Sequence, residues 1–246
     1  MNSTTIIVVG LLLLSIVSGM LGLGVAFAAV PFLSLFLPDL VHQVQPLTLI
    51  LNGVTALFST FGFARSGYVD WPKAITLAVV TTIVAPVGAY LVQFVSQSYV
   101  WLIYLAAVIY LAYNLFKPTK GEAGRVENFK LALILAVPIS ILAGFLGIGP
   151  GFLLMPTLIL VRFDPKRAAG INAFAVTPPS FSALIPHWRT MQIDWQLAGI
   201  LLVVGAIGSF GGARLASVYV PSSRLKQMFG VLIVIMTLYK IYTLLA

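Results

Sequence analysis

The sequence contains no cysteine, and only 8% of its 246 residues carry a charge. Without cysteine the chain has no disulfide, no thiolate metal site and no sulfur nucleophile. A water-soluble domain carries roughly 25% charged residues, so a soluble fold of this length would have too few charges to cover its surface. The low charge therefore excludes an ordinary soluble protein and indicates a membrane protein.

Acidic residues and catalytic motifs are equally scarce. The six Asp and Glu all fall in predicted loops: Asp39, Asp70, Glu122, Glu127, Asp164 and Asp194. A cation transporter or proton relay needs carboxylates inside its apolar segments, so neither is predicted here. The apolar runs hold no HExxH, no GxSxG and no paired Asp, and the chain has no Walker A motif. We predict no enzyme activity, no cofactor and no metal site.

What the sequence has in abundance is apolar runs. Eight follow one another, at about residues 5–37, 44–64, 72–94, 98–116, 129–161, 168–187, 194–216 and 226–245. Six are close to the ~20 residues that a membrane-spanning helix needs. The first and fifth are too long for a hydrocarbon core of ~30 Å. Each has a glycine cluster in its middle, so we expect both runs to break there.

The chain is also a duplication. Three glycines and a proline of the first run recur 125 residues later in the fifth: Gly19, Gly22, Gly24 and Pro31 match Gly144, Gly147, Gly149 and Pro156. The segment 65–71 recurs as 189–195, with an offset of 124. The only long polar connection lies between the copies. We predict a first repeat at 1–116, a cytoplasmic linker at 117–128 and a second repeat at 129–246.

The net charge of +8 reflects short basic loops rather than a surface for nucleic acid. If each long run folds back at its glycines, the 14 Lys and Arg divide twelve to two, with Arg189 and Lys240 in the minority. If each run crosses once, they divide eight to six. The positive-inside rule favours the first arrangement, with both termini outside the cytoplasm.

The predicted fold is therefore an all-α polytopic membrane protein of two inverted repeats. It has eight long transmembrane helices, with the first and fifth runs broken at glycines, which gives eight to ten membrane segments. The predicted location is the cell inner (cytoplasmic) membrane, which the chain crosses several times.

The glycine breaks are the first candidate site. Unwound backbone in a membrane is tolerated only where it is buried or lines a cavity. A helix that restarts there presents unpaired N–H groups and the positive end of its dipole, which together favour an anion. The residues expected to bind are Gly22, Gly24, Gly147, Gly149 and Gly151. A single cluster would favour close helix packing instead, but two copies at matching positions favour a site.

Polar side chains inside apolar runs extend this candidate site. Thr48, Asn52 and Asn172 can donate hydrogen bonds to an anion without burying a charge. The alternative for each is a helix–helix hydrogen bond. Arg189, beside His187 on the charge-poor side, is predicted to attract anions at a vestibule, and the alternative for both is an interfacial position.

These features resemble the sulfite exporter TauE/SafE family of bacterial and archaeal membrane proteins. The resemblance rests on the duplicated segments GMLGLGVAFAAVP and GFLGIGPGFLLMP, the two R-x4-D-W turns, the stretch 168–172 and the stretch 211–215. It implies transport of small oxidised sulfur or organosulfur anions. The first copy has fewer glycines than the family pattern, so the two halves are expected to contribute unequally.

The predicted function is a secondary transporter of a small anion, sulfite or an organosulfonate such as sulfoacetate, bound between the repeats. Its expected partners are this anion and the lipid bilayer, with no nucleic acid, and a homodimer is left open. Two alternatives remain: a passive anion channel built from the same parts, and a membrane-embedded receptor or assembly subunit.

Overall fold

The computed structural model describes residues 3–96, 98–100, 102–103, 106, 109, 127–225, 227–228 and 231. Secondary structure in these residues is helical, with no strand. The predicted apolar runs at 98–116 and 226–245 and the predicted linker at 117–128 lie largely outside the described residues.

Six described helices are long and apolar enough to cross a membrane. They are α1 (Ser3–Leu21), α3 (Gln45–Ala64), α4 (Trp71–Leu91), α6 (Phe129–Leu146), α8 (Pro165–Ser182) and α9 (Trp195–Tyr219). Shorter elements are α2 (Ala26–Leu33), α7 (Gly151–Leu160), the π-helix η1 (Leu40–Val44) and the 3-10 turns η2 (Val92–Phe94) and η3 (Ile185–His187). The two other predicted long helices correspond to the runs outside the described residues.

The scarce polar residues of the loops mark where helices begin. Asp70, Asp164 and Asp194 each accept hydrogen bonds from the first backbone N–H groups of α4, α8 and α9. Asn128 does the same for α6. Such caps satisfy N–H groups that have no partner within the helix. The described acidic residues are thus in loops, as predicted, and most of them serve as helix caps.

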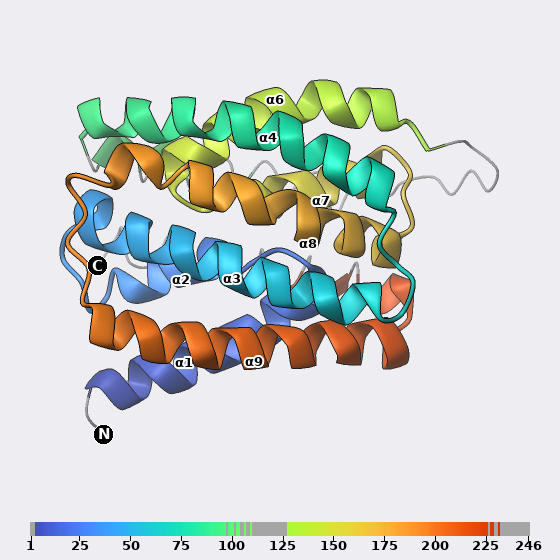
Figure 1. The fold of residues 1–246 in the computed structure, drawn as a ribbon, viewed down its shortest axis with the longest axis horizontal. Helices are drawn as coiled ribbons and strands as arrows, with labels where there is room; N and C mark the ends of the chain where they lie inside the picture. Colours follow the sequence, from blue (N-terminus) through green and yellow to red (C-terminus); the bar gives the residue numbers. More distant parts are fainter. Residues whose placement is uncertain are drawn as a thin grey trace.

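The long helices stand side by side in the order α6, α4, α8, α3, α9, α1 (Figure 1). The short helices α2 and α7 pack beside α3 and α8. We call the helices α1, α2, α3 and α9 the first bundle, and α4, α6, α7 and α8 the second bundle. The two bundles meet mainly where α3 packs on α8.

Each bundle takes one of its three long helices from the other half of the sequence. Helix α1 packs on α9, and its repeat equivalent α6 packs on α4. Glycines allow the helices to approach closely in both contacts. A Cβ on Gly19 would overlap the backbone of Ser209, and one on Gly144 would overlap that of Ala85. Gly144 and Ala85 are the repeat equivalents of Gly19 and Ser209. Small residues that let helix backbones approach are typical of membrane interfaces.

Equivalent helices run in opposite directions along the molecule. Helix α8 begins where the turn between α3 and α4 lies, since Gly170 meets the backbone of Tyr68. Helix α4 ends where α8 ends, since Gln93 Nε2 donates to Pro186 O over 2.6 Å. Helix α3 therefore runs toward the α3–α4 turn and α8 runs away from it, and α9 and α4 are opposed in the same way (Figure 1).

Basic residues gather at the end of the molecule that holds the α3–α4 turn, which we call the basic end. The described Lys and Arg side chains at or beside helix termini there are Arg65, Lys73, Lys130, Arg162, Lys166, Arg167, Arg214 and Arg224. Arg189 is the one described Lys or Arg at the opposite end, where it lies in the turn after η3.

Candidate functional site

Both over-long apolar runs break at their glycines. Helix α1 ends at Leu21, and Gly22 and Gly24 follow with φ of 64° and 70°. Helix α6 ends at Leu146, and Gly147 and Gly149 both have φ of 67°. These positive φ values lie in the left-handed region, which glycine adopts without the steric cost of a Cβ. The predicted breaks are confirmed.

The short helices after the breaks begin next to each other in the centre of the molecule. The rings of Phe27 in α2 and Phe152 in α7 stack with centroids 4.9 Å apart and planes 4° from parallel. A Cβ on Gly151 would overlap Leu23 O of the other break. The first residues of α2 and α7 are buried. Two helix N-termini thus meet inside the apolar body of the molecule.

Side chains of α3 cover the N-terminus of α2. Thr55 Oγ1 accepts from Val25 N at 3.1 Å, and Asn52 Oδ1 accepts from Ala26 N at 2.9 Å. Asn52 Nδ2 donates to Ser180 Oγ of α8 at 2.8 Å. Asn52 is fully buried, so its amide joins α2, α3 and α8 in a place without water to compete.

Asn172 of α8 joins the two breaks to each other. Its Nδ2 donates to Gly22 O at 2.7 Å and to Gly151 O at 3.1 Å. The equivalent residue, Thr48 of α3, donates through Oγ1 to Gly147 O at 3.3 Å and to carbonyls of its own helix. Asn172 Oδ1 is buried and has no hydrogen-bond partner among the described residues.

The structure brings together eight of the ten predicted site residues. They are Gly22, Gly24, Thr48, Asn52, Gly147, Gly149, Gly151 and Asn172. The other two are elsewhere. His187 is buried at the far end of α8, where its ring nitrogens have no partner among the described residues, and Arg189 is exposed beyond it.

The sequence model of the sulfite exporter TauE/SafE family matches residues 6–241. The chain belongs to this family. A probable membrane transporter protein of Xylella fastidiosa (strain Temecula1) is 27% identical over 237 residues, which cover 91% of this chain and 89% of the relative. The probable membrane transporter protein YunE of Bacillus subtilis is 25% identical over 241 residues, 86% of each chain.

The likeness extends to archaea. A probable membrane transporter protein of Methanocaldococcus jannaschii is 24% identical over 194 residues, which cover 74% of this chain and 71% of the relative. No solved structure matches the chain. The family, its transporter relatives and the apolar helices make this TauE/SafE protein a multi-pass membrane transporter.

Three further residues of this TauE/SafE chain belong to the centre but were not among the predicted binders. Thr55 and Ser180 form the hydrogen bonds described above, and the side chain of Gln45 lies against Gly147. Thr55 stands three residues after Asn52 and thus on the same helix face, a spacing that could have indicated it. No comparable signal marks Gln45 or Ser180.

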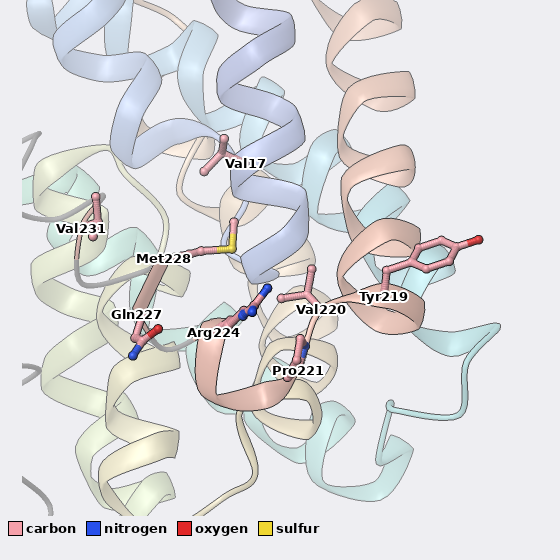
Figure 2. Close-up of a pocket in the computed structure, with 8 residues that line it drawn as sticks. All are labelled: Val17, Tyr219, Val220, Pro221, Arg224, Gln227, Met228 and Val231. Atoms are coloured by element: carbon pink, nitrogen blue, oxygen red, sulfur yellow. The ribbon is translucent and has the colours of Figure 1, made fainter.

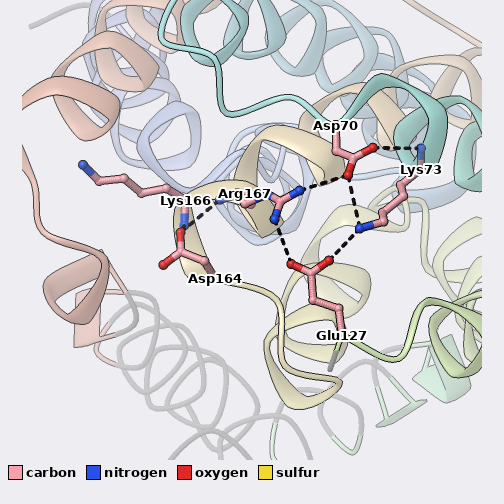
Figure 3. Close-up of polar contacts among 6 residues, drawn as sticks. All are labelled: Asp70, Lys73, Glu127, Asp164, Lys166 and Arg167. Atoms are coloured by element: carbon pink, nitrogen blue, oxygen red, sulfur yellow. Dashed lines mark hydrogen bonds and ion pairs between the residues drawn. The ribbon is translucent and has the colours of Figure 1, made fainter. Parts of the chain in front are cut away.

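A second polar cluster lies at the basic end of the TauE/SafE fold (Figure 3). Lys73 Nζ lies 2.6 Å from Glu127 Oε2 and 3.2 Å from Asp70 Oδ2. Arg167 lies 3.1 Å from both carboxylates. Burial alone would raise the pKa of Asp70, but the hydrogen bonds and charge of Lys73, with the charge of Arg167, hold it below the usual 3.8. These four residues, the ionic cluster, join the starts of α4, α6 and α8.

Two surface grooves of the TauE/SafE structure are lined by no residue of the glycine breaks. The first, of about 560 Å³, is lined by Val17, Tyr219, Val220, Pro221, Arg224, Gln227, Met228 and Val231 (Figure 2). The second, of about 580 Å³, lies between α3 and α9 beside Arg65 and Phe210. Both are mainly apolar, as expected of helix faces that meet lipid. Among the described residues no cluster of His, Asp and Glu could hold a metal ion.

Proposed function

We propose that this TauE/SafE protein is a secondary transporter that binds a small anion at the glycine breaks. Sulfite or an organosulfonate such as sulfoacetate is the expected substrate. One observation carries the proposal: α2 and α7 begin beside each other in the buried centre, where Phe27 stacks on Phe152. Both helix dipoles point their positive ends toward this place, which suits an anion without a buried Lys or Arg.

The two halves of the chain act as inverted repeats in this proposal. Its support is the opposed direction of α3 and α8 and of α4 and α9 (Figure 1). The glycine contacts agree, since a Cβ on Gly88 would overlap Ile141 O while one on its equivalent Gly212 would overlap Ile16 O. Transporters with such repeats bind substrate at the interface, near the middle of the membrane.

Alternating access then follows from rocking the first bundle against the second around the α3–α8 contact. Each bundle is tied internally, the second by the ionic cluster and the first by Arg214 Nη1, which donates to Ser66 Oγ at 2.9 Å. The breaks lie at the boundary between the bundles, where a small rotation exposes them to one side or the other. A passive channel has less support, because Leu23, Val25 and Ala26 at the centre are fully buried.

The basic end faces the cytoplasm in this proposal, and the protein lies in the cell inner membrane. Its support is the gathering of Lys and Arg at that end, in agreement with the positive-inside rule. Helix α1 begins at the opposite end, because it runs parallel to α9, with Leu12 against Gly208 and Ile16 against Gly212.

Gly149→Leu tests the site. Gly149 has a φ of 67°, and its Cβ would overlap Asn52 Nδ2, so the side chain would enter the proposed site. Counterflow of labelled sulfite in proteoliposomes should fall to background, at least about a hundredfold below the unsubstituted protein, as expected when a large side chain blocks a close-fitting site.

Gly199→Leu is the matched control, because a Cβ on this exposed α9 glycine meets nothing within 4 Å. It should transport normally. Gel filtration in detergent checks that both variants are folded. A folded Gly149→Leu protein that transports sulfite at the normal rate would exclude the glycine breaks as the site.

A further inference from the structure

The two helix N-termini at the centre are not equivalent. Asn52 Oδ1 and Thr55 Oγ1 accept from the backbone N–H groups at the start of α2. Their repeat equivalents beside α7 are Val176 and Pro179, whose side chains have no acceptor. A Cβ on Gly151 would lie 2.7 Å from Val176 Cγ2, so Val176 does face this terminus. These two positions of α8 thus supply no side-chain acceptor to the start of α7.

The amide of Asn52 and the hydroxyl of Ser180 also lie near the start of α7. A Cβ on Gly149 would overlap Asn52 Nδ2 and lie 3.2 Å from Ser180 Oγ. Both side chains are fully buried. An anion at the first turn of α7 would therefore meet the positive end of a helix and polar groups that α3 and α8 hold in place.

One group in this place does not suit a simple anion. Asn172 Nδ2 is held by Gly22 O and Gly151 O, so its Oδ1 lies beside the start of α7 with no partner among the described residues. A buried acceptor without a donor costs ~1–3 kcal/mol. The lone pairs of this oxygen would repel an anion's oxygens unless the anion supplied a hydrogen to share.

We propose that the substrate is a small monoanion that carries its own hydrogen-bond donor, such as hydrogensulfite or a hydroxyl-bearing sulfonate. Its anionic oxygens lie at the first turn of α7, and its O–H donates to Asn172 Oδ1. This inference rests on the proposed function and narrows its substrate class, because it excludes sulfoacetate, which at neutral pH is a dianion without an O–H. A fully deprotonated oxyanion lacks the donor, and the described residues of the site include no Lys or Arg to balance a second charge.

Two sulfonates with the same number of heavy atoms provide the test. 2-Hydroxyethanesulfonate has a hydroxyl donor where propane-1-sulfonate has a methyl group. Each is added at increasing concentration to proteoliposomes that take up labelled sulfite. 2-Hydroxyethanesulfonate should inhibit at about tenfold lower concentration, the size of effect that one satisfied buried hydrogen bond produces. Equal inhibition by the two sulfonates would overturn the inference.

The internal repeat supplies the informative variant, Asn172→Thr. The equivalent Thr48 donates to Gly147 O and to its own helix, so a threonine at 172 should keep the contact with Gly22 O while removing the amide oxygen. The preference for 2-hydroxyethanesulfonate should disappear in this variant. A preference that survives at full size would assign it to another group and overturn the inference.

Thr177→Ser, on the same helix, is the control. The hydroxyl of Thr177 donates to Ala173 O within α8. The Thr177→Ser variant should therefore prefer the hydroxyl-bearing sulfonate as strongly as the unsubstituted protein does. The comparison on the unsubstituted protein needs no variant and decides the matter even if Asn172→Thr does not fold. A failure of the proposed function looks different: no sulfite uptake occurs, and neither sulfonate has anything to inhibit.

Discussion

Asn52 makes the connection on which the centre of the molecule depends. Its amide accepts from Ala26 N and donates to Ser180 Oγ, so one side chain of α3 holds the start of α2 and touches α8. It is fully buried, and without it Ala26 N would lack a partner in an apolar setting, whereas Ser180 Oγ would still donate to Val176 O. The proposed function gives Asn52 a binding role as well, because the atoms that hold the break also surround the proposed site.

Asn52→Ala should therefore lower the free energy of unfolding by about 1–3 kcal/mol, because it leaves the buried Ala26 N–H without its acceptor, whereas Ser180 Oγ keeps its hydrogen bond to Val176 O. Chemical unfolding in detergent micelles measures this. Thr60→Ala is the matched control on α3, because the buried Thr60 hydroxyl donates only within its own helix, to Ala56 O. The prediction is wrong if the two variants lose the same stability.

The sequence predicts these residues better than it predicts their partners. Gly22, Gly24, Gly147 and Gly149 stand in runs too long for one span, and length alone forces a break. No comparable constraint pairs Asn52 with Ser180, because that contact depends on how α3 and α8 lie in space. That Asn52, Asn172 and Thr48 bind an anion remains a prediction, since each has protein partners in this structure.

At the scale of elements, most of the described charged residues lie at or just before the starts of helices. Asp70 caps α4 and also belongs to the ionic cluster that links α4, α6 and α8 (Figure 3). Capping residues before apolar runs are visible in a sequence. The sequence does not show that these charged residues meet, because Glu127 and Arg167 come from segments that reach Asp70 only after the second bundle has formed.

The lowered pKa of Asp70 predicts how stability depends on pH. A carboxylate with a lowered pKa stabilises the fold fully above its ordinary pKa of 3.8, and this contribution is lost as the pH falls through the lower folded value. Asp70→Asn keeps the cap but loses the charge. The variant should melt below the unsubstituted protein at neutral pH, and the difference should shrink at about pH 3.

Asp194→Asn serves as the comparison for this measurement. Asp194 caps α9 in the same way but has no basic partner among the described residues. Its substitution should cause a smaller change in melting temperature at neutral pH. Equal changes for the two caps would show that the ionic cluster adds nothing to stability.

At the scale of the whole molecule, the orientation of the chain in the membrane can be measured directly. The protein has no cysteine, so single cysteines report their side of the membrane without background. Lys130 at the basic end and Thr190 at the opposite end are both exposed. In intact cells a membrane-impermeant thiol reagent should label Thr190→Cys, and it should reach Lys130→Cys only after the membrane is opened. The reverse pattern would contradict the proposed orientation.

The duplication in the sequence predicts two matching halves, but it does not predict which helices pack together. Matching glycines at 19 and 144 reveal a repeat, whereas the exchange of α4 and α9 between bundles depends on contacts between residues far apart in the sequence. Periodicity and hydropathy describe each helix alone, and in lipid an apolar face does not identify its partner.

Because α4 and α9 are exchanged between the bundles, the first bundle cannot be complete until α9 has been synthesised. Helix α1 is synthesised before α9, its main packing partner, and most of the described helices lie between the two in the sequence. The first bundle therefore cannot pack fully until the ribosome has synthesised the second half of the chain. Chaperones or the insertion machinery would have to protect an early intermediate whose glycine face, at Gly10 and Gly19, still lacks α2 or α9 against it.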